Sequence, residues 1–339
     1  SYANEGGWFD CDKVRFRQGY PEKIGGWGKI GSNSFLGTCR ALHPWRTLAL
    51  DLFLGLGTSS KYYIESGQGY YDITPLRETT AAGGATLAKV ANGDPTITVA
   101  DPSHGAVAGD FVTFSDAVSL GGSITAAILN QEYEIDVIVD SNSYQIKARE
   151  VADVSAITIN GVYTPTTVNA AAGDSGNGGG SIVAAYQVST GLNSAIFGTG
   201  WGAGTWSRNT WGSAASLTLT DVLRIWTHDN FGEDLLINVR NADIYFWDAS
   251  EINALSTRAT SLATRAAALG LTGAPTVATK VLVSDIDRHI LAFGTDAIGD
   301  AGVQDPLLIR FSDQQNAFDW TPTVDNSAGD LRLGSGSKI

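Results

Sequence analysis

The sequence has no methionine and is poor in cysteine and histidine. Its two cysteines, Cys11 and Cys39, are too few for a disulfide-stapled scaffold; we expect two free, partly buried thiols, and a single disulfide between them is the alternative. Its four histidines lie far apart, at positions 43, 104, 228 and 289, without the short spacing of metal ligands. The sequence therefore predicts no metal site and no bound cofactor.

Long apolar runs and excess positive charge are also missing. No stretch reaches the roughly 18 apolar residues of a membrane helix, so we expect no membrane span. Lys and Arg number 22 against 35 Asp and Glu, a net charge of −13, which argues against a protein that grips nucleic acid through phosphates. A hydrophobic fraction of 43% excludes global disorder, and 339 residues allow two or three domains.

Tryptophan is absent from the middle of the chain, although the flanks contain nine. Residues 79–190 hold 3 basic and 11 acidic side chains, a net charge of −8, whereas residues 1–78 carry +1 and residues 191–339 carry −6. Apolar and polar residues alternate over 96–99 and 110–114, and turn residues separate these runs. Such short, punctuated strands predict that 79–190 is an inserted small β-barrel or immunoglobulin-like module.

The flanks share a repeated pattern of an apolar strand, a turn, and a strand that ends in aromatic residues and Asp. The copies are 52–57 with 61–64 and 71–75, 234–239 with 243–248, and 289–294 with 307–312 and 318–322. Without the insert, the period of about 50–70 residues is typical of β-propeller blades, and unrelated hairpins in a β-sandwich are the alternative. We therefore predict a mostly β chain: 1–78 as an N-terminal segment with the first blade, the inserted module, and 191–339 as further blades.

The set of blades is incomplete, because about three copies are visible where closed propellers have roughly four to eight. Residues 331–339 have the composition of the start of another blade. We expect the chain to be a portion of a longer polypeptide, or its sheets to be completed by partner chains.

One stretch has helical spacing. Its apolar stripe is followed by Gly270, a residue typical of helix ends, and consists of Ile252, Leu255, Ala259, Leu262, Ala266 and Leu269. This pattern predicts one short helix packed on the edge of the β core, with a partner-binding helix as the alternative.

Two groups of side chains are candidates for a subunit interface. Lys13, Arg15 and Arg17 alternate with apolar residues, so a strand would place the three cations on one face, suited to an acidic partner. Trp201, Trp206 and Trp211 lie among glycines, and aromatic anchors of this kind dominate binding energy at interfaces. For the cations, the alternative is an ordinary polar strand face beside an apolar one. For the tryptophans, the alternatives are packing against the chain's own blades and stacking on a sugar.

Other motifs carry little chemistry. Residues 26–31 match the G-x-G-x-x-G spelling, but neither the strand nor the helix of a nucleotide site flanks them. Acidic clusters at 132–136, 285–287 and 296–300 could seat calcium or a glycosidase pair, yet alternating acids on a strand are more typical of a solvated face. We predict no catalytic residue and no enzymatic activity.

Three segments together resemble a known family. Residues 7–27, 285–289 and 320–331 are similar to segments of tail proteins of the nozzle, or tail-tube, type in tailed bacteriophages. The resemblance implies a non-enzymatic structural protein of the virion tail, made in the bacterial host cytoplasm. It further implies a homo-oligomeric ring, usually sixfold, that bears β-propellers and lies below the portal and its adaptor.

The same resemblance implies partners: the portal or adaptor, other tail proteins, and double-stranded DNA that passes transiently through the ring during ejection. The alternative hypothesis is a tail-associated propeller that binds glycans or degrades polysaccharide. Residues 312–321 are similar to the Asp-box of sialidase propellers, although no glycine holds the turn, and that box marks a fold and not an active site.

Overall fold

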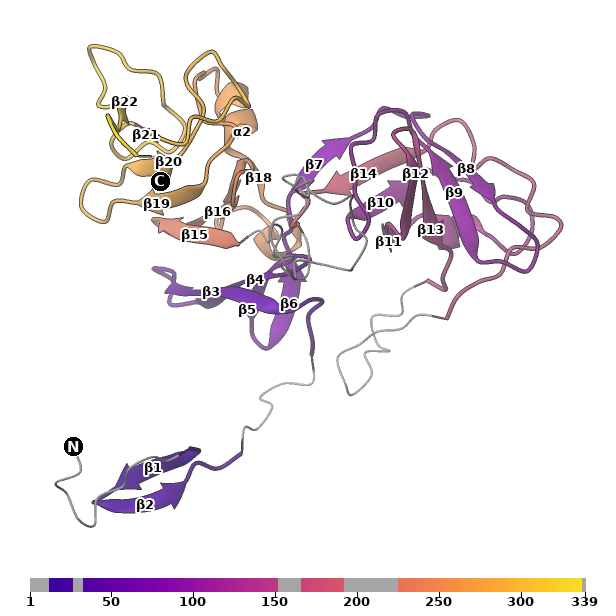
Figure 1. Cartoon of the computed structure of the whole chain (residues 1–339), viewed down its shortest axis with the longest axis horizontal. Coiled ribbons are helices and arrows are strands. Elements are labelled where there is room, and N and C mark those ends of the chain that lie inside the picture. Colours follow the sequence, from indigo (N-terminus) through magenta and orange to yellow (C-terminus); the bar gives the residue numbers. More distant parts are fainter. Residues whose placement is uncertain (1–11, 27–32, 152–165, 192–224, 337–339) are drawn as a thin grey trace, which may run out of the picture. The chain divides into compact units, whose positions relative to one another are not determined.

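The computed structural model describes residues 12–26, 33–151, 166–191 and 225–336. Within these residues, the strands form five four-stranded antiparallel sheets and one two-stranded hairpin, with two short α-helices (Figure 1). The predicted mostly β, propeller-like fold class is confirmed. The chain divides into two compact units, residues 1–32 and 33–339.

The first unit contains the hairpin of β1 (Val14–Arg17) and β2 (Tyr20–Lys23). Gln18 and Gly19 both have positive φ, which closes the tight turn between the strands. Because opposed residues of an antiparallel pair share a face, Arg15, Glu22 and Arg17 lie on one face and Val14 with Phe16 on the other.

Three sheets of the second unit are simple meanders, which we call blades 1, 2 and 3. Blade 1 is β3 (Cys39–Arg46), β4 (Leu52–Thr58), β5 (Tyr62–Ser66) and β6 (Gly69–Asp72). Blade 2 is β15 (Trp226–Phe231), β16 (Asp234–Val239), β17 (Ile244–Trp247) and β18 (Thr260–Ser261). Blade 3 is β19 (Lys280–Val283), β20 (Ile290–Phe293), β21 (Leu308–Phe311) and β22 (Gly329–Arg332).

The first strands of the blades lie side by side in sequence order, since β15 contacts both β3 and β19. Hydrogen bonds join these strands: His43 of β3 pairs with Asn230 at 2.5 Å, and the Val283 amide of β19 donates to the Asp229 carboxylate at 2.8 Å. First strands that meet while whole sheets stack face to face are the arrangement of consecutive propeller blades.

Blade 2 is buried on both faces because its strands are apolar at consecutive positions. Leu235 and Ile237 pack against blade 1, in a core with Tyr62 and Ile64. The intervening Leu236 packs against blade 3. The blade 1–2 core also holds Trp226, Val239, Tyr245 and Trp247, and the blade 2–3 core holds Ile244, Phe246, Val281, Ile290, Ala292 and Trp320. Strand pleating sends neighbouring side chains to opposite faces, so one strand supplies both cores.

The inserted module interrupts the chain between blades 1 and 2. One sheet orders β11 (Glu132–Glu134), β10 (Phe111–Ser115), β14 (Val183–Gln187) and β7 (Leu76–Thr79). The other orders β12 (Val137–Asp140), β13 (Ser143–Lys147), β9 (Thr96–Ala100) and β8 (Thr86–Lys89). The sheets share one apolar core, and the short helix α1 (Ala126–Leu129) contributes Leu129 to it. Leu76 pairs with Gln187, so the chain enters and leaves the module at adjacent positions.

The predicted helix is shorter than its apolar stripe. Residues 254–256 form a 3-10 turn, residues 260–261 pair with β17 as β18, and α2 spans only Leu262–Ala268. Ser261 accepts a hydrogen bond from the Thr264 amide and so begins the helix as its N-cap, while Ile252 is 90% exposed. Gly270 has a positive φ just after the helix, as predicted.

Two further expectations are corrected. Residues 329–332 are the fourth strand of blade 3, not the start of another blade, because β22 pairs with β21. Residues 318–322 form no strand: Trp320 is fully buried in the blade 2–3 core, and its Nε1 donates to the Ala317 carbonyl at 2.9 Å. Cys39 is a free thiol, as expected, but it is exposed and not partly buried, and Cys11 lies outside the described residues.

The blade 1–2 packing predicts the effect of a small substitution. A Cβ on Gly57 would lie 2.6 Å from the Trp226 ring, so Gly57→Ala must push the indole from its pocket. We expect Gly57→Ala to lower the free energy of unfolding by about 2 kcal/mol in urea titrations. Gly180→Ala is the control, since open space surrounds that position; equal effects of the two substitutions would contradict the packing argument.

Candidate functional site

A buried lysine marks the polar centre where blade 1, blade 2 and the inserted module meet. Lys61 is the last residue of the turn between β4 and β5 and is 4% exposed. The Thr58 hydroxyl accepts a hydrogen bond from the Lys61 amide at 2.9 Å, which shapes this tight turn. The Lys61 Nζ lies over the Phe111 ring of the module, 4.8 Å from the ring centroid, and this cation–π contact stabilises the charged amine.

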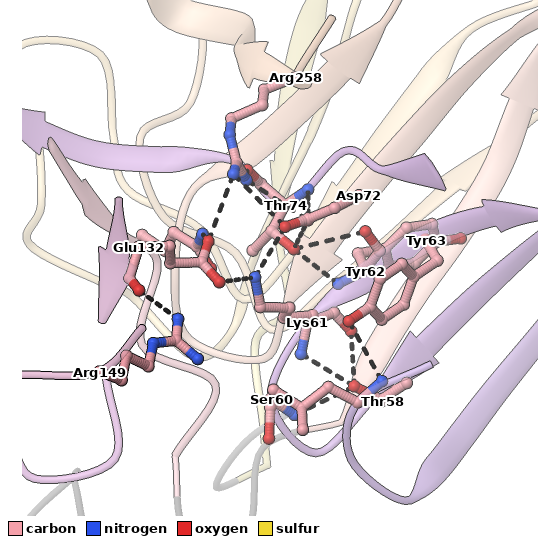
Figure 2. Close-up of polar contacts among 12 residues, drawn as sticks. Thr58, Ser60, Lys61, Tyr62, Tyr63, Asp72, Thr74, Glu132, Arg149 and Arg258 are labelled. Carbon is pink, nitrogen blue, oxygen red and sulfur yellow. Dashed lines mark hydrogen bonds and ion pairs between the residues drawn. The ribbon is translucent and has the colours of Figure 1, made fainter. Parts of the chain in front are cut away.

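Lys61 lies beside three other charged side chains, as Figure 2 shows. We call this group the junction cluster: Lys61, Asp72, Glu132 and Arg258. Lys61 Nζ lies 2.7 Å from Asp72 Oδ2 and 2.5 Å from Glu132 Oε1. Arg258 reaches Asp72 Oδ1 at 3.3 Å and Glu132 Oε2 at 3.5 Å. Two cations and two carboxylates alternate, so the cluster is electrically neutral.

Each part of the second unit that meets here supplies at least one member. Lys61 and Asp72 come from blade 1, Glu132 comes from β11 of the module, and Arg258 comes from the segment between β17 and β18 of blade 2. The side-chain amide of Gln187, the last residue of β14, donates to Glu132 Oε2 at 2.5 Å. The cluster therefore ties the module to both blades.

The carboxylates are saturated by donors. Asp72 accepts from the Thr74 amide at 2.9 Å and the Thr74 hydroxyl at 2.5 Å, besides both cations. Burial acts to raise the pKa of Asp72, but Lys61, Arg258 and Thr74 more than offset it, so this pKa stays below its ordinary value. An acid held ionised and fully paired is a poor proton donor, and the cluster is suited to holding parts together.

A cavity of about 580 Å³ adjoins the cluster between the module and blade 2. Its lining includes Arg77 and Val107 from the module side and Asp243, Tyr245 and Arg258 from the blade side. Burial raises the pKa of Asp243 to about 7, although hydrogen bonds from Ser261 and the Ile244 amide act the other way. Asp243 is the one acidic side chain among the described residues that line the cavity, whereas glycoside hydrolysis uses two.

A second polar contact lies between blades 1 and 2. The Tyr62 hydroxyl is 2.7 Å from His228 Nδ1, and the His228 ring lies 4.9 Å from that of His43. Burial, together with the neighbouring His43, lowers the pKa of His228 to about 4. His228 is therefore neutral at physiological pH and acts as a hydrogen-bonding part of the interface between the blades.

The sequence candidates for a subunit interface lie elsewhere. Lys13 precedes β1 and has a φ of 56°, so only Arg15 and Arg17 share a strand face, and the predicted three-cation face is wrong. Arg15 pairs across the hairpin with Glu22 at 3.1 Å. Trp201, Trp206 and Trp211 lie outside the described residues.

The acidic clusters do not form metal sites in the part of the chain that the structure describes. The segment 132–136 divides by environment: Glu132 enters the junction cluster, whereas exposed Asp136 pairs with Lys147 at 3.2 Å. Our reading of this segment as a uniformly solvated face is therefore wrong at Glu132. Among the described residues, no helix has the length and apolarity needed to cross a membrane.

Sequence reasoning missed Lys61, Asp72 and Arg258. One signal was available, because Lys61 interrupts two apolar strands of the first repeat and Asp72 belongs to its aromatic-Asp ending. A cation in such a place needs a buried counter-charge, but nothing in the sequence identifies Glu132, which is 71 residues away, as that partner.

Comparison with known proteins adds little. No protein-family model matches the chain, and no curated protein matches it significantly. Among solved structures, the chain is similar to the phage phi92 endosialidase, with 11% sequence identity and a TM-score of 0.21 over 93% of this chain. The chain spans 40% of the length of that protein, and a TM-score this low carries no argument about fold or activity.

The junction cluster predicts a large effect of removing its central cation. Lys61→Met leaves two partly buried carboxylates with Arg258 alone, so we expect a loss of about 3 kcal/mol in the free energy of unfolding. Lys147→Met, which breaks an exposed pair, should cost less than about 1 kcal/mol. Urea titration measures both, and equal losses would show that the cluster does not stabilise the junction.

The raised pKa of Asp243 predicts that folding stability falls as pH rises, whereas an ordinary carboxylate ion pair makes stability rise with pH. Its pKa is near 7 in the folded chain but near 3.8 in an unfolded one, so wild-type stability falls as pH rises between these values. Asp243→Asn removes this titration, and its stability relative to wild type should rise by roughly 2 kcal/mol from pH 4 to pH 8.

Asp248 provides the control for that measurement, because its pKa is shifted in the opposite direction. Burial acts to raise its pKa, but hydrogen bonds from Ser250 and a 2.9 Å pair with Arg265 lower it overall. Asp248→Asn should therefore lose stability relative to wild type as pH rises through the acid range. Thermal unfolding from pH 2 to pH 8 covers both windows, below about pH 4 for Asp248 and between about pH 4 and pH 7 for Asp243, and slopes of the same sign would contradict the assignment of Asp243.

Proposed function

We propose that the chain is a non-enzymatic structural component of a bacteriophage tail, part of a ring below the portal and its adaptor through which DNA is ejected. The observation that carries the proposal is the stack of three consecutive four-stranded blades, interrupted by one β module. This arrangement agrees with the family that segments 7–27, 285–289 and 320–331 resemble.

The junction cluster supports a mechanical role. It joins two blades and the module through directional ion pairs, so the module is held by more than the two chain crossings at Leu76 and Gln187. Within the described residues, its carboxylates are paired with cations and face no free base or nucleophile. A fixed attachment of this kind suits a part that transmits load within an assembly.

The negative charge of the chain is only weak support for free passage of DNA, because most of the net charge lies outside the blades. The net charge of −13 includes −8 on residues 79–190, which make up most of the module, leaving −5 for the remaining 227 residues. An acidic surface repels phosphate and lets a duplex slide. The blades are thus mildly acidic, and we place no DNA contact on particular residues.

The competing function is a tail-associated protein that binds or degrades polysaccharide. The cavity beside Asp243 is its best candidate site, but only one carboxyl group from the described residues lines it. A protonated Asp243 alone could donate a proton to a leaving group but would leave no second carboxylate to activate water.

The decisive experiment has two readouts. An antibody against the purified chain should label the tail of intact virions in electron micrographs, at the end nearest the head. The purified chain should leave the viscosity of the host's surface polysaccharide unchanged, with Asp243→Asn as a matched variant. Unlabelled virions would overturn the tail assignment, and a fall in viscosity lost in Asp243→Asn would establish the enzyme instead.

A further inference from the structure

A buried arginine lines a small cavity in blade 3. Arg310 of β21 is 2% exposed. The cavity has a volume of about 280 Å³, and its other walls come from α2, from the loop that follows α2 and from the loop between β20 and β21. Apolar side chains make up much of these walls, among them Ala263, Ala267, Ala274, Ala297, Ile298 and Ala301. We call this cavity the Arg310 pocket.

Among the described residues, the hydrogen-bond acceptors of Arg310 are all neutral. Its Nη1 donates to the Asp296 carbonyl at 3.2 Å. Its Nη2 donates to the Gly273 carbonyl and, at 3.4 Å, to the Trp320 carbonyl. The Nε atom is buried and has no hydrogen-bond partner in this part of the chain. A guanidinium has five N–H groups, so these three bonds leave some of its donors unused.

Arg310 therefore lacks, within the described residues, the paired anion that a buried cation normally has. Asp296 lines the same pocket, but neutral groups occupy its carboxylate: the Thr276 hydroxyl at 2.5 Å and the Gly302 amide at 3.1 Å. Asp330 lies opposite Arg310 on β22 and is exposed. Burial lowers the pKa of Arg310, although the charges of Asp296 and Asp330 act the other way.

We propose that the Arg310 pocket binds a carboxylate carried on a short aliphatic chain. The carboxylate supplies the negative charge that Arg310 lacks and accepts a charge-assisted hydrogen bond from the guanidinium. The aliphatic part packs against the alanine-rich walls, which bury its surface. This inference concerns a pocket of blade 3 and does not depend on a place in a virion.

The pocket walls select against other anions. A phosphate carries more negative charge, and the Asp296 carboxylate in the same wall repels it more strongly than it repels a single carboxylate. Chloride has no apolar part to fill the space between the alanines. A volume of about 280 Å³ lies at the lower limit of ligand cavities, so it suits a small acid or one acidic side chain.

Two probes distinguish a free acid from a side chain of another protein. Propionate represents the free acid, and the blocked tripeptide acetyl-Ala-Glu-Ala-amide represents an acidic side chain. Each is titrated against the full chain by saturation-transfer difference NMR, with sodium chloride holding the ionic strength constant. Propionamide is the control ligand, because it has the shape of propionate without the charge.

We expect wild type to bind propionate with a Kd on the order of 10 mM and propionamide roughly tenfold more weakly. Arg310→Gln removes the cation and should weaken propionate binding roughly tenfold or more. Arg310→Lys keeps the charge and should retain part of the affinity, which a loss of hydrogen-bonding geometry alone would not allow.

A second pair of variants leaves Arg310 unchanged, because this side chain also holds three backbone carbonyls in place. Ala267 is exposed on α2 and lines the pocket, so Ala267→Leu fills part of the space. Ala268→Leu is the matched control, since Ala268 is exposed on the same helix and does not line the pocket. We expect Ala267→Leu to weaken propionate binding roughly tenfold and Ala268→Leu to leave it unchanged.

Binding of the tripeptide would assign the carboxylate to another protein, and binding of propionate alone would assign it to a free acid. Either result supports a carboxylate site. The site is overturned if neither probe binds wild type, if propionamide binds as tightly as propionate, or if the two α2 substitutions have equal effects. None of these outcomes bears on the tail assignment, which virion labelling tests separately.

Discussion

The fold depends on the burial of blade 2 between its two neighbours. Leu235 and Ile237 face one core while Leu236 faces the other, so a strand of six residues holds two apolar layers together. A sheet that is apolar on both faces is unstable in water by itself. The neighbouring blades are therefore a requirement of the sequence of β16.

The junction cluster adds direction to this apolar stack. Apolar faces tolerate small shifts, whereas Lys61 and Arg258 must each reach two carboxylates at ion-pair distance. Because the four charges balance, their burial leaves no isolated charge. The inserted module gains a defined position through Glu132, although it has its own core and is covalently attached only at its two ends.

Strand prediction succeeded where apolar alternation and turn residues agreed. The apolar runs at 52–57 and 234–239 became β4 and β16, and Gly270 ended α2. The helix that begins at Leu262 was predicted too long, because hydrogen bonding to β17 competes with helical periodicity at residues 260–261 and the Ser261 cap then sets the start. The spacing of apolar residues along the chain does not reveal whether residues 260–261 will pair with β17 or join the helix.

The candidate site was not predictable in the same way. Glu132 stands in an alternating acidic segment that looks solvated, and only the approach of blade 1 places Lys61 against it. By itself the sequence determined the strands at 52–57 and 234–239 and the separate character of residues 79–190, because these depend on neighbours along the chain. The tertiary structure alone decided the ion pairs and the raised pKa of Asp243, because each depends on which distant segments exclude water from one another.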